Sequence, residues 1–347
     1  MFSFVTRFIP TSYFLPGWLT LETNPLNSLL QGLVCACGVS VLSSMVRVHL
    51  FLEESWSDKN DKDTSSQSAV SHQQRTNTGL GGKLQFLLVA ATLAVVGSRV
   101  ASLVVLEFCL RTVSGWVTAG PESSKFLQQL FVQSQFSLGC ALSCSLYFLH
   151  EGAPQRWLCL LLAAMLSWFL ASQATRLLNH VMVLYKLHSS QRYCGICISL
   201  LTSGRFLMPM LCRTMIITFS VAVFAAISII NQQFLSATEA LRFWTPLTIC
   251  YTLLVVYMQE EQHSQPNSQV VLNTVVVRLG GLTVLMLTVG HWADVLHILM
   301  CFLGEASCLI PNRDLLDVAS SQEEEECTDY VKRQHHRRPQ VQQKKDR

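Results

Sequence analysis

The sequence predicts an all-α, polytopic membrane helix bundle with a disordered charged tail at its C-terminus. Half of the 347 residues are hydrophobic and only 14% are charged, whereas about a quarter of residues are charged in an ordinary soluble domain. Apolar runs of about 20 residues, the length that a helix needs to cross the hydrocarbon core, recur along the chain. The lipid bilayer is therefore the expected solvent of this protein and its first expected partner.

Three regions are expected. Residues 1–28 are apolar and aromatic but are interrupted by Pro10 and Pro16, which favours a segment lying at the level of the lipid headgroups. Residues 29–310 form the transmembrane bundle, which contains a hydrophilic loop over 52–83. Residues 311–347 are rich in charge and poor in apolar residues, so we expect them to be disordered.

Eight spans are predicted within the bundle. The interrupting Arg205 and Pro209 leave a seven-span alternative open, in which the fifth segment is short or re-entrant. The last segment is long enough to hold a crossing and a surface helix. The eight segments are Leu29–Phe51, Leu84–Leu106, Phe126–Leu149, Trp157–Leu178, Ile196–Leu211, Met215–Ile230, Leu241–Glu261 and Val271–Leu303.

Local patterns predict further details of these segments. Arg47 lies late enough in the first span to extend toward the headgroups. The tight turn HEGAPQR predicts that the two spans around it form an antiparallel hairpin. Residues 179–192 fit a helical extension along the interface. Ser236 and Glu239 have the spacing of a capping box, and Pro246 predicts a kink in the span that follows.

Four stretches carry a family resemblance. They are RFWTPLTICYTLLVVYMQEEQ from Arg242, HSSQRYCG at 188–195, VVGSRVASLVVLEF at 95–108 and EGAPQR at 151–156. Over about residues 26–317 the chain resembles the transmembrane protein 82 family. The resemblance implies a multi-pass membrane protein, and it implies no activity, substrate or catalytic residue.

Several classes of function have no support in the residues. The thirteen cysteines lie mostly inside apolar runs, where a thiol behaves as a small hydrophobic group, and the single CxxC at Cys194 and Cys197 lacks further metal ligands. Cys140 and Cys144, spaced i, i+4, are explained by close helix packing. A net charge of +3 without an RNA-binding motif argues against nucleic acid. We expect neither an enzyme nor a cofactor.

Ionisable residues inside the predicted spans are the candidate site residues, because such residues are rare in lipid and usually face an interior. Arg99 lies mid-span and should have a partner on another helix; we expect Asp294, with backbone carbonyls or a water-filled cavity as alternatives. Glu107 and Arg111 form an i, i+4 pair that we expect near the interface. The full set of candidates is Arg99, Asp294, Arg278, His291 and His297, although the histidines and Asp294 cannot readily face one metal ion.

Two functions remain open. A non-enzymatic membrane scaffold or interaction protein would use these charges only to pair helices, and a transporter or channel-like protein would use them as an intramembrane site. The basic tail should be cytosolic, and Lys344 and Lys345 resemble a dilysine signal for retrieval to the endoplasmic reticulum. Eight spans place the loop at 55–82 and the tail on opposite sides, whereas seven place them on the same side.

Overall fold

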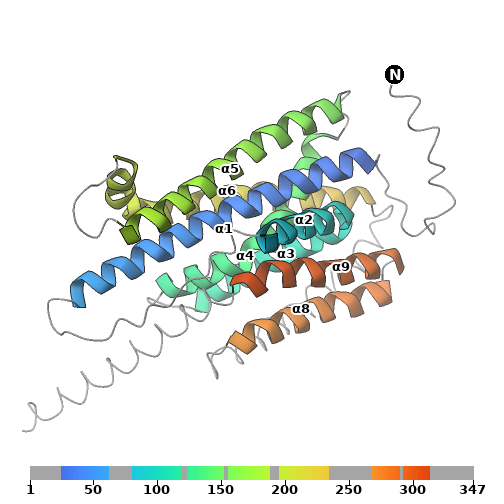
Figure 1. Cartoon of the computed structure of the whole chain (residues 1–347). Helices are drawn as coiled ribbons and strands as arrows, with labels where there is room; N and C mark the ends of the chain where they lie inside the picture. The colour runs from blue at the N-terminus through green and yellow to red at the C-terminus, as the bar shows by residue number, and fades with distance from the viewer. Residues whose placement is uncertain are drawn as a thin grey trace, which may run out of the picture.

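The computed structural model describes residues 25–61, 80–118, 123–151, 155–187, 195–233, 268–289 and 292–312. All secondary structure in these ranges is helical (Figure 1), which confirms the predicted all-α class. The helices are α1 (Pro25–Asp61), α2 (Leu80–Val95), α3 (Ser98–Thr118), α4 (Ser123–Leu149), α5 (Arg156–Leu187), α6 (Gly195–Gln233), α8 (Ser268–Val289) and α9 (Trp292–Leu309), followed by the short 3-10 helix η3 (Ile310–Asn312).

Four of these helices are long and apolar enough to cross a membrane: Pro25–Leu52, Arg156–Met182, Leu207–Gln232 and Asp294–Asn312. The pair α2 and α3 makes a fifth if it counts as one span. A multi-pass membrane protein is therefore supported, while these segments alone do not establish the predicted eight or seven spans. The predictions for residues 1–24, for Leu241–Glu261 with Pro246, and for residues 313–347 lie outside the described residues.

The predicted span Leu84–Leu106 is not one straight helix, because the chain bends by 109° between α2 and α3. Gly97 stands at the break, and its carbonyl accepts the hydrogen bond of Ala101 N, which opens α3. A Cβ on Gly97 would lie 3.3 Å from Nδ1 of His297, so the close approach of α9 favours a glycine there. Arg99 consequently lies in the first turn of α3 and not in the middle of a span.

Two other predicted boundaries are also wrong. Ile196–Leu211 and Met215–Ile230 belong to one continuous helix, α6, which contains Pro209. Proline removes one backbone hydrogen bond, and membrane helices tolerate this loss where local adjustments satisfy the freed carbonyl. Val271–Leu303 is not one continuous helix, because α8 ends at Val289 and α9 begins at Trp292, and the two helices lie side by side (Figure 1).

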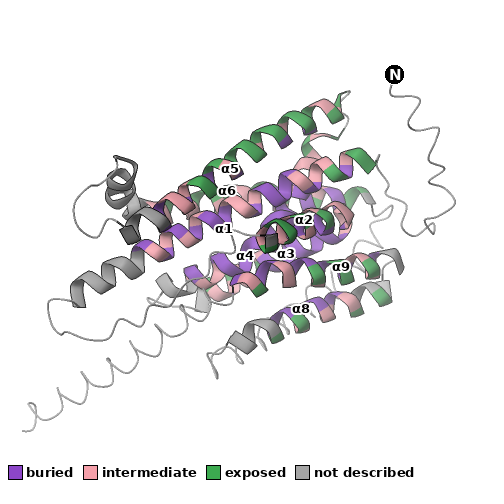
Figure 2. Cartoon of the chain, viewed as in Figure 1, coloured by how far each residue is buried: buried purple, intermediate pink, exposed green. Residues whose placement is uncertain are grey.

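The predicted hairpin of Phe126–Leu149 and Trp157–Leu178 is correct in direction, because the two helices are antiparallel, but incorrect in packing. The two helices exist as α4 and α5, but α5 packs along α1 (Figure 1). Leu178 and Met182 of α5 form a small apolar cluster with Val48 and Leu52 of α1. Much of the rest of α5 is exposed, as Figure 2 shows. Its continuation to Leu187 agrees with the predicted extension, and α1 likewise continues to Asp61, into the stretch predicted to be a loop.

Helix α4 lies at the centre of the bundle, where it contacts α1, α3, α6 and α9. Its buried residues are purple in Figure 2 and include Cys140, Ala141 and Cys144, which are fully buried. These small side chains allow close packing, and Cys144 Sγ lies 3.6 Å from Ser102 Oγ of α3. The cysteines whose side chains are described are all free, in agreement with the absence of a disulfide framework.

Candidate functional site

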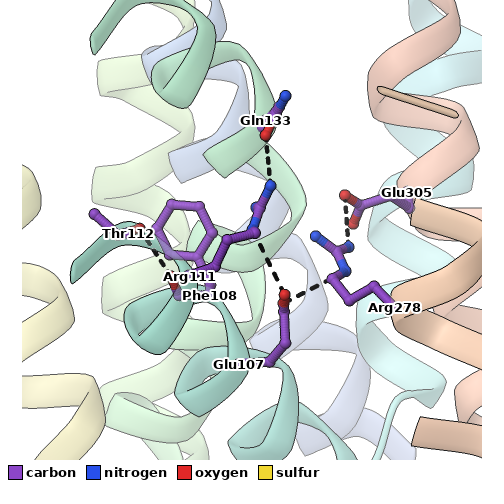
Figure 3. Close-up of polar contacts among 7 residues, drawn as sticks. All are labelled: Glu107, Phe108, Arg111, Thr112, Gln133, Arg278 and Glu305. Carbon is purple, nitrogen blue, oxygen red and sulfur yellow. Dashed lines mark hydrogen bonds and ion pairs between the residues drawn. The ribbon is translucent and has the colours of Figure 1, made fainter. Parts of the chain in front are cut away.

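Four charged side chains meet where α3, α8 and α9 come together (Figure 3). Arg278 Nη2 lies 2.8 Å from Glu305 Oε1, and Arg278 Nε lies 3.4 Å from Glu107 Oε2. Arg111 Nε lies 3.5 Å from the other carboxylate oxygen of Glu107. Charges therefore alternate along the series Arg111, Glu107, Arg278, Glu305, which we call the charge cluster.

The helices place these four residues for simple reasons. Glu107 and Arg111 are one helical turn apart on α3, with the acid first, which is the favourable order. Arg278 lies 11 residues before the end of α8 at Val289, and Glu305 lies 13 residues after the start of α9 at Trp292, so the antiparallel packing of α8 and α9 brings them to nearly the same level. The cluster thus joins one turn of α3 to a hairpin close to the other end of the chain.

The charge cluster is buried. The side chains of Glu107, Arg278 and Glu305 are each 1% exposed, and that of Arg111 is 12% exposed. Removing an ion from water costs several kcal/mol even after the protein relaxes, so each of these charges depends on its partners. Two acids and two bases balance, and the cluster as a whole carries no net charge.

Polar groups of the central helix α4 extend this arrangement on two sides. Arg111 Nη1 donates a hydrogen bond to Gln133 Oε1, and the Arg111 guanidinium also lies 5.3 Å from the centre of the Phe108 ring. Elsewhere, Arg47 Nη2 donates to Asn312 Oδ1 at 3.0 Å, and Asn312 Nδ2 donates to Gln135 Oε1 at 3.0 Å. Arg47 therefore binds inside the bundle and does not extend outward as the sequence predicts.

Arg99 and Asp294 form a second, separate ion pair. Arg99 Nη2 lies 3.6 Å from Asp294 Oδ2, which confirms the predicted partner. Asp294 is 7% exposed and occupies the first turn of α9, where the helix dipole favours a negative charge. Arg99 is 27% exposed, so this pair is more accessible to solvent than the charge cluster is.

The remaining candidates are not drawn together. Arg278 belongs to the charge cluster, at a distance along the helices from the Arg99–Asp294 pair. His297 lies against Gly97 at the bend, and the side chain of His291 is outside the described residues, as are those of Lys344 and Lys345. Within the described ranges, no group of three His, Cys, Asp or Glu residues is placed to hold a metal ion.

The sequence interpretation missed the charge cluster as a unit. It identified Arg278 but not its partners, because the last span was ended at Leu303, two residues before Glu305. It also placed the pair of Glu107 and Arg111 near the interface, whereas both are buried. Glu305 lies almost as far after the start of α9 as Arg278 lies before the end of α8, and this spacing is the signal that could have found it.

Comparison with protein families gives one match. Residues 26–330 match the family model described as Transmembrane protein 82. The matched region contains every residue of the charge cluster and both residues of the second ion pair. No solved structure matches the chain.

Proposed function

The chain belongs to the transmembrane protein 82 family, and from this premise we propose that it is a non-enzymatic membrane scaffold or interaction protein. Its intramembrane charges hold the bundle together and do not bind a transported ion. Its partners are lipid and membrane or cytosolic proteins, and it needs neither a cofactor nor nucleic acid.

The charge cluster is the observation that carries this proposal. An ion pathway requires a charge that a substrate can reach and that is left without full compensation. In the cluster, two acids and two bases alternate, and three of the four side chains are 1% exposed. Balanced, buried pairs of this kind are what helix packing alone requires in an apolar medium.

A transporter is the second candidate, and the bend of 109° between α2 and α3 favours it. Substrate sites of secondary transporters often lie at broken helices, whose free ends bind charged groups. The break at Gly97 lies beside the partly exposed Arg99. Asp294 already compensates this guanidinium, which is why we place the scaffold first.

Flux measurements distinguish the two candidates. The full-length protein is reconstituted into liposomes, and the fluxes of H⁺, Na⁺, K⁺ and Cl⁻ are compared with those of protein-free liposomes. We expect equal rates. A flux that is present in the wild type and lost in Asp294→Asn, a variant that keeps the size and shape of the side chain, would show transport and remove the scaffold proposal.

A positive test uses blue native electrophoresis of the full chain extracted in digitonin. A scaffold should migrate in an assembly larger than the purified protein in the same detergent. The extract should come from cells that express the protein from its own locus. If the extracted protein migrates at the position of the purified protein, the scaffold proposal is contradicted, even if no flux is found.

We also propose that the tail faces the cytosol and that its terminal lysines retrieve the protein to the endoplasmic reticulum. The support is the tail's content of Lys and Arg and the positions of Lys344 and Lys345 near its end. Replacing both lysines by serine should move the protein outward along the secretory route, as seen by microscopy. Unchanged localisation would remove the retrieval signal and leave the choice between endoplasmic reticulum and plasma membrane to other residues.

A further inference from the structure

The directions of the helices follow from polar contacts between them. Helix α9 is a candidate span that runs from Asp294 to Asn312, so these residues define two ends of the bundle, the Asp294 end and the Asn312 end. In α1, the late residue Arg47 binds Asn312, whereas the early residue Gln31 donates a hydrogen bond to Ser143. Helix α1 therefore runs toward the Asn312 end, parallel to α9.

Helices α3 and α4 run in opposite directions. Arg99 at the start of α3 pairs with Asp294, and Glu107 reaches Glu305 through Arg278, so α3 is parallel to α9. Cys144, late in α4, lies 3.6 Å from Ser102, and the earlier Gln133 accepts a hydrogen bond from Arg111. Helix α4 therefore begins at the Asn312 end and finishes at the Asp294 end.

Helix α2 also begins at the Asn312 end. Gln85 Nε2, early in α2, donates to Ser307 O of α9 at 3.0 Å, and Gly97, just after α2, lies against His297 near the start of α9. The chain thus runs down α2 to the Asp294 end and returns along α3 to the Asn312 end. A single span over the same residues would have ended on the opposite side.

The other helices complete the path. Helix α5 runs parallel to α1, because its first residue Arg156 stacks on Tyr147 while its later part packs on Val48 and Leu52. Helix α6 returns, since Leu207 joins the same small cluster and Phe224 contacts Phe148, with ring centres 5.6 Å apart. Helix α8 is antiparallel to α9 and so begins at the Asn312 end, opposite the end at which α6 finishes.

These directions assign the end of each helix to one of the two ends of the bundle. Three connections lie at the Asn312 end: α1 to α2, α3 to α4, and α5 to α6. Asn312, which precedes the tail, lies there too. At the Asp294 end lie the start of α1, the junction of α2 and α3, the junction of α4 and α5, the end of α6, the end of α8 and the start of α9.

Positive charge differs between the two ends. Leaving the tail aside, the flanks at the Asn312 end carry seven Lys and Arg residues, and the flanks at the Asp294 end, with the N-terminal segment, carry four. Loops rich in Lys and Arg stay in the cytosol. The seven are Lys59, Lys62, Arg75, Lys83, Lys125, Lys186 and Arg192, and the four are Arg7, Arg99, Arg156 and Arg242.

We propose that the hydrophilic stretch between α1 and α2 and the C-terminal tail lie together on the cytosolic side of the membrane, with the N-terminus on the opposite side. The two longest hydrophilic parts of the chain then form one cytosolic face, available to the same soluble partner. This arrangement does not depend on whether the protein is a scaffold or a transporter.

Introduced glycosylation sites test the proposal in the full-length protein expressed in cells. Single substitutions create an Asn-x-Ser/Thr acceptor in each of three places: Phe4→Asn before α1, Ser66→Asn between α1 and α2, and Glu326→Asn in the tail. We expect a glycosidase-sensitive gel shift for Phe4→Asn alone. Modification of only one of the other two variants overturns the shared side, and modification of both overturns the cytosolic assignment.

A second measurement decides the case in which no variant is modified. Epitopes at residue 66 and at the C-terminus should bind antibody in cells whose plasma membrane alone is opened with digitonin, whereas an N-terminal epitope should require full permeabilisation. An N-terminal epitope that is detected after digitonin, or a residue-66 epitope that is not, overturns the proposal.

Discussion

The free energy of unfolding of an Arg278 variant is the sharpest test of the charge cluster. Arg278 is the only member that contacts both carboxylates, Glu107 at 3.4 Å and Glu305 at 2.8 Å. Arg278→Met therefore leaves two buried acids and one base, Arg111, which lies 3.5 Å from Glu107 and not beside Glu305. The buried charge changes from zero to minus one.

The expected decrease in the free energy of unfolding follows from this charge imbalance. Breaking a buried pair by removing one partner costs about 3–5 kcal/mol, which is roughly a 100-fold to 4,000-fold change in the unfolding equilibrium. The double variant Arg278→Met with Glu305→Met leaves Glu107 and Arg111 balanced. Replacement of a whole buried pair by apolar groups of similar volume is often neutral, so we expect the double variant within about 1 kcal/mol of the wild type.

Unfolding of the purified full chain in mixed micelles, with a rising fraction of SDS and helicity as the readout, measures these differences. Arg213→Met is the matched control, because Arg213 lies on the exposed side of α6 and the same substitution there should change little. The single variants Arg278→Met and Glu305→Met are measured as well. If the double variant lowers the free energy of unfolding by the sum of the two single effects, the residues are not coupled and the cluster does not stabilise the bundle.

Three further predictions follow from other contacts. Arg99→Leu and Asp294→Leu should be coupled in the same assay by only about 1 kcal/mol, because Arg99 is 27% exposed and solvent screens the pair; a coupling as large as that of the cluster would contradict this. Gly304→Ala should cost about 1–3 kcal/mol because the ring of Phe136 occupies the position of the added methyl group, whereas Gly280→Ala, with open space around it, should not destabilise; equal effects would refute the packing argument. Deletion of residues 62–75 should leave membrane expression unchanged, since the stretch is polar and loop length costs entropy only logarithmically; loss of expression would show that it contributes to folding.

The sequence by itself determined the helical class, the membrane as solvent, and the ion pairs Arg99–Asp294 and Glu107–Arg111. Long apolar runs and scarce charge are local properties, and in lipid they permit little besides helices. Arg99 could be matched to Asp294 because an intramembrane cation needs a partner and few acids lie within apolar segments.

Tertiary structure alone decided the bend at Gly97, the packing of α5 on α1, and the charge cluster. Gly97 lies within an apolar run, and its neighbours in sequence do not predict a bend. The need for glycine there arises only from the contact with His297 of α9. The HEGAPQR turn predicts that α5 packs on α4, yet α5 packs along α1, where Val48 and Leu52 contact it. Glu107, Arg278 and Glu305 come from separate parts of the chain, and only the packing of three helices brings them within reach of one another.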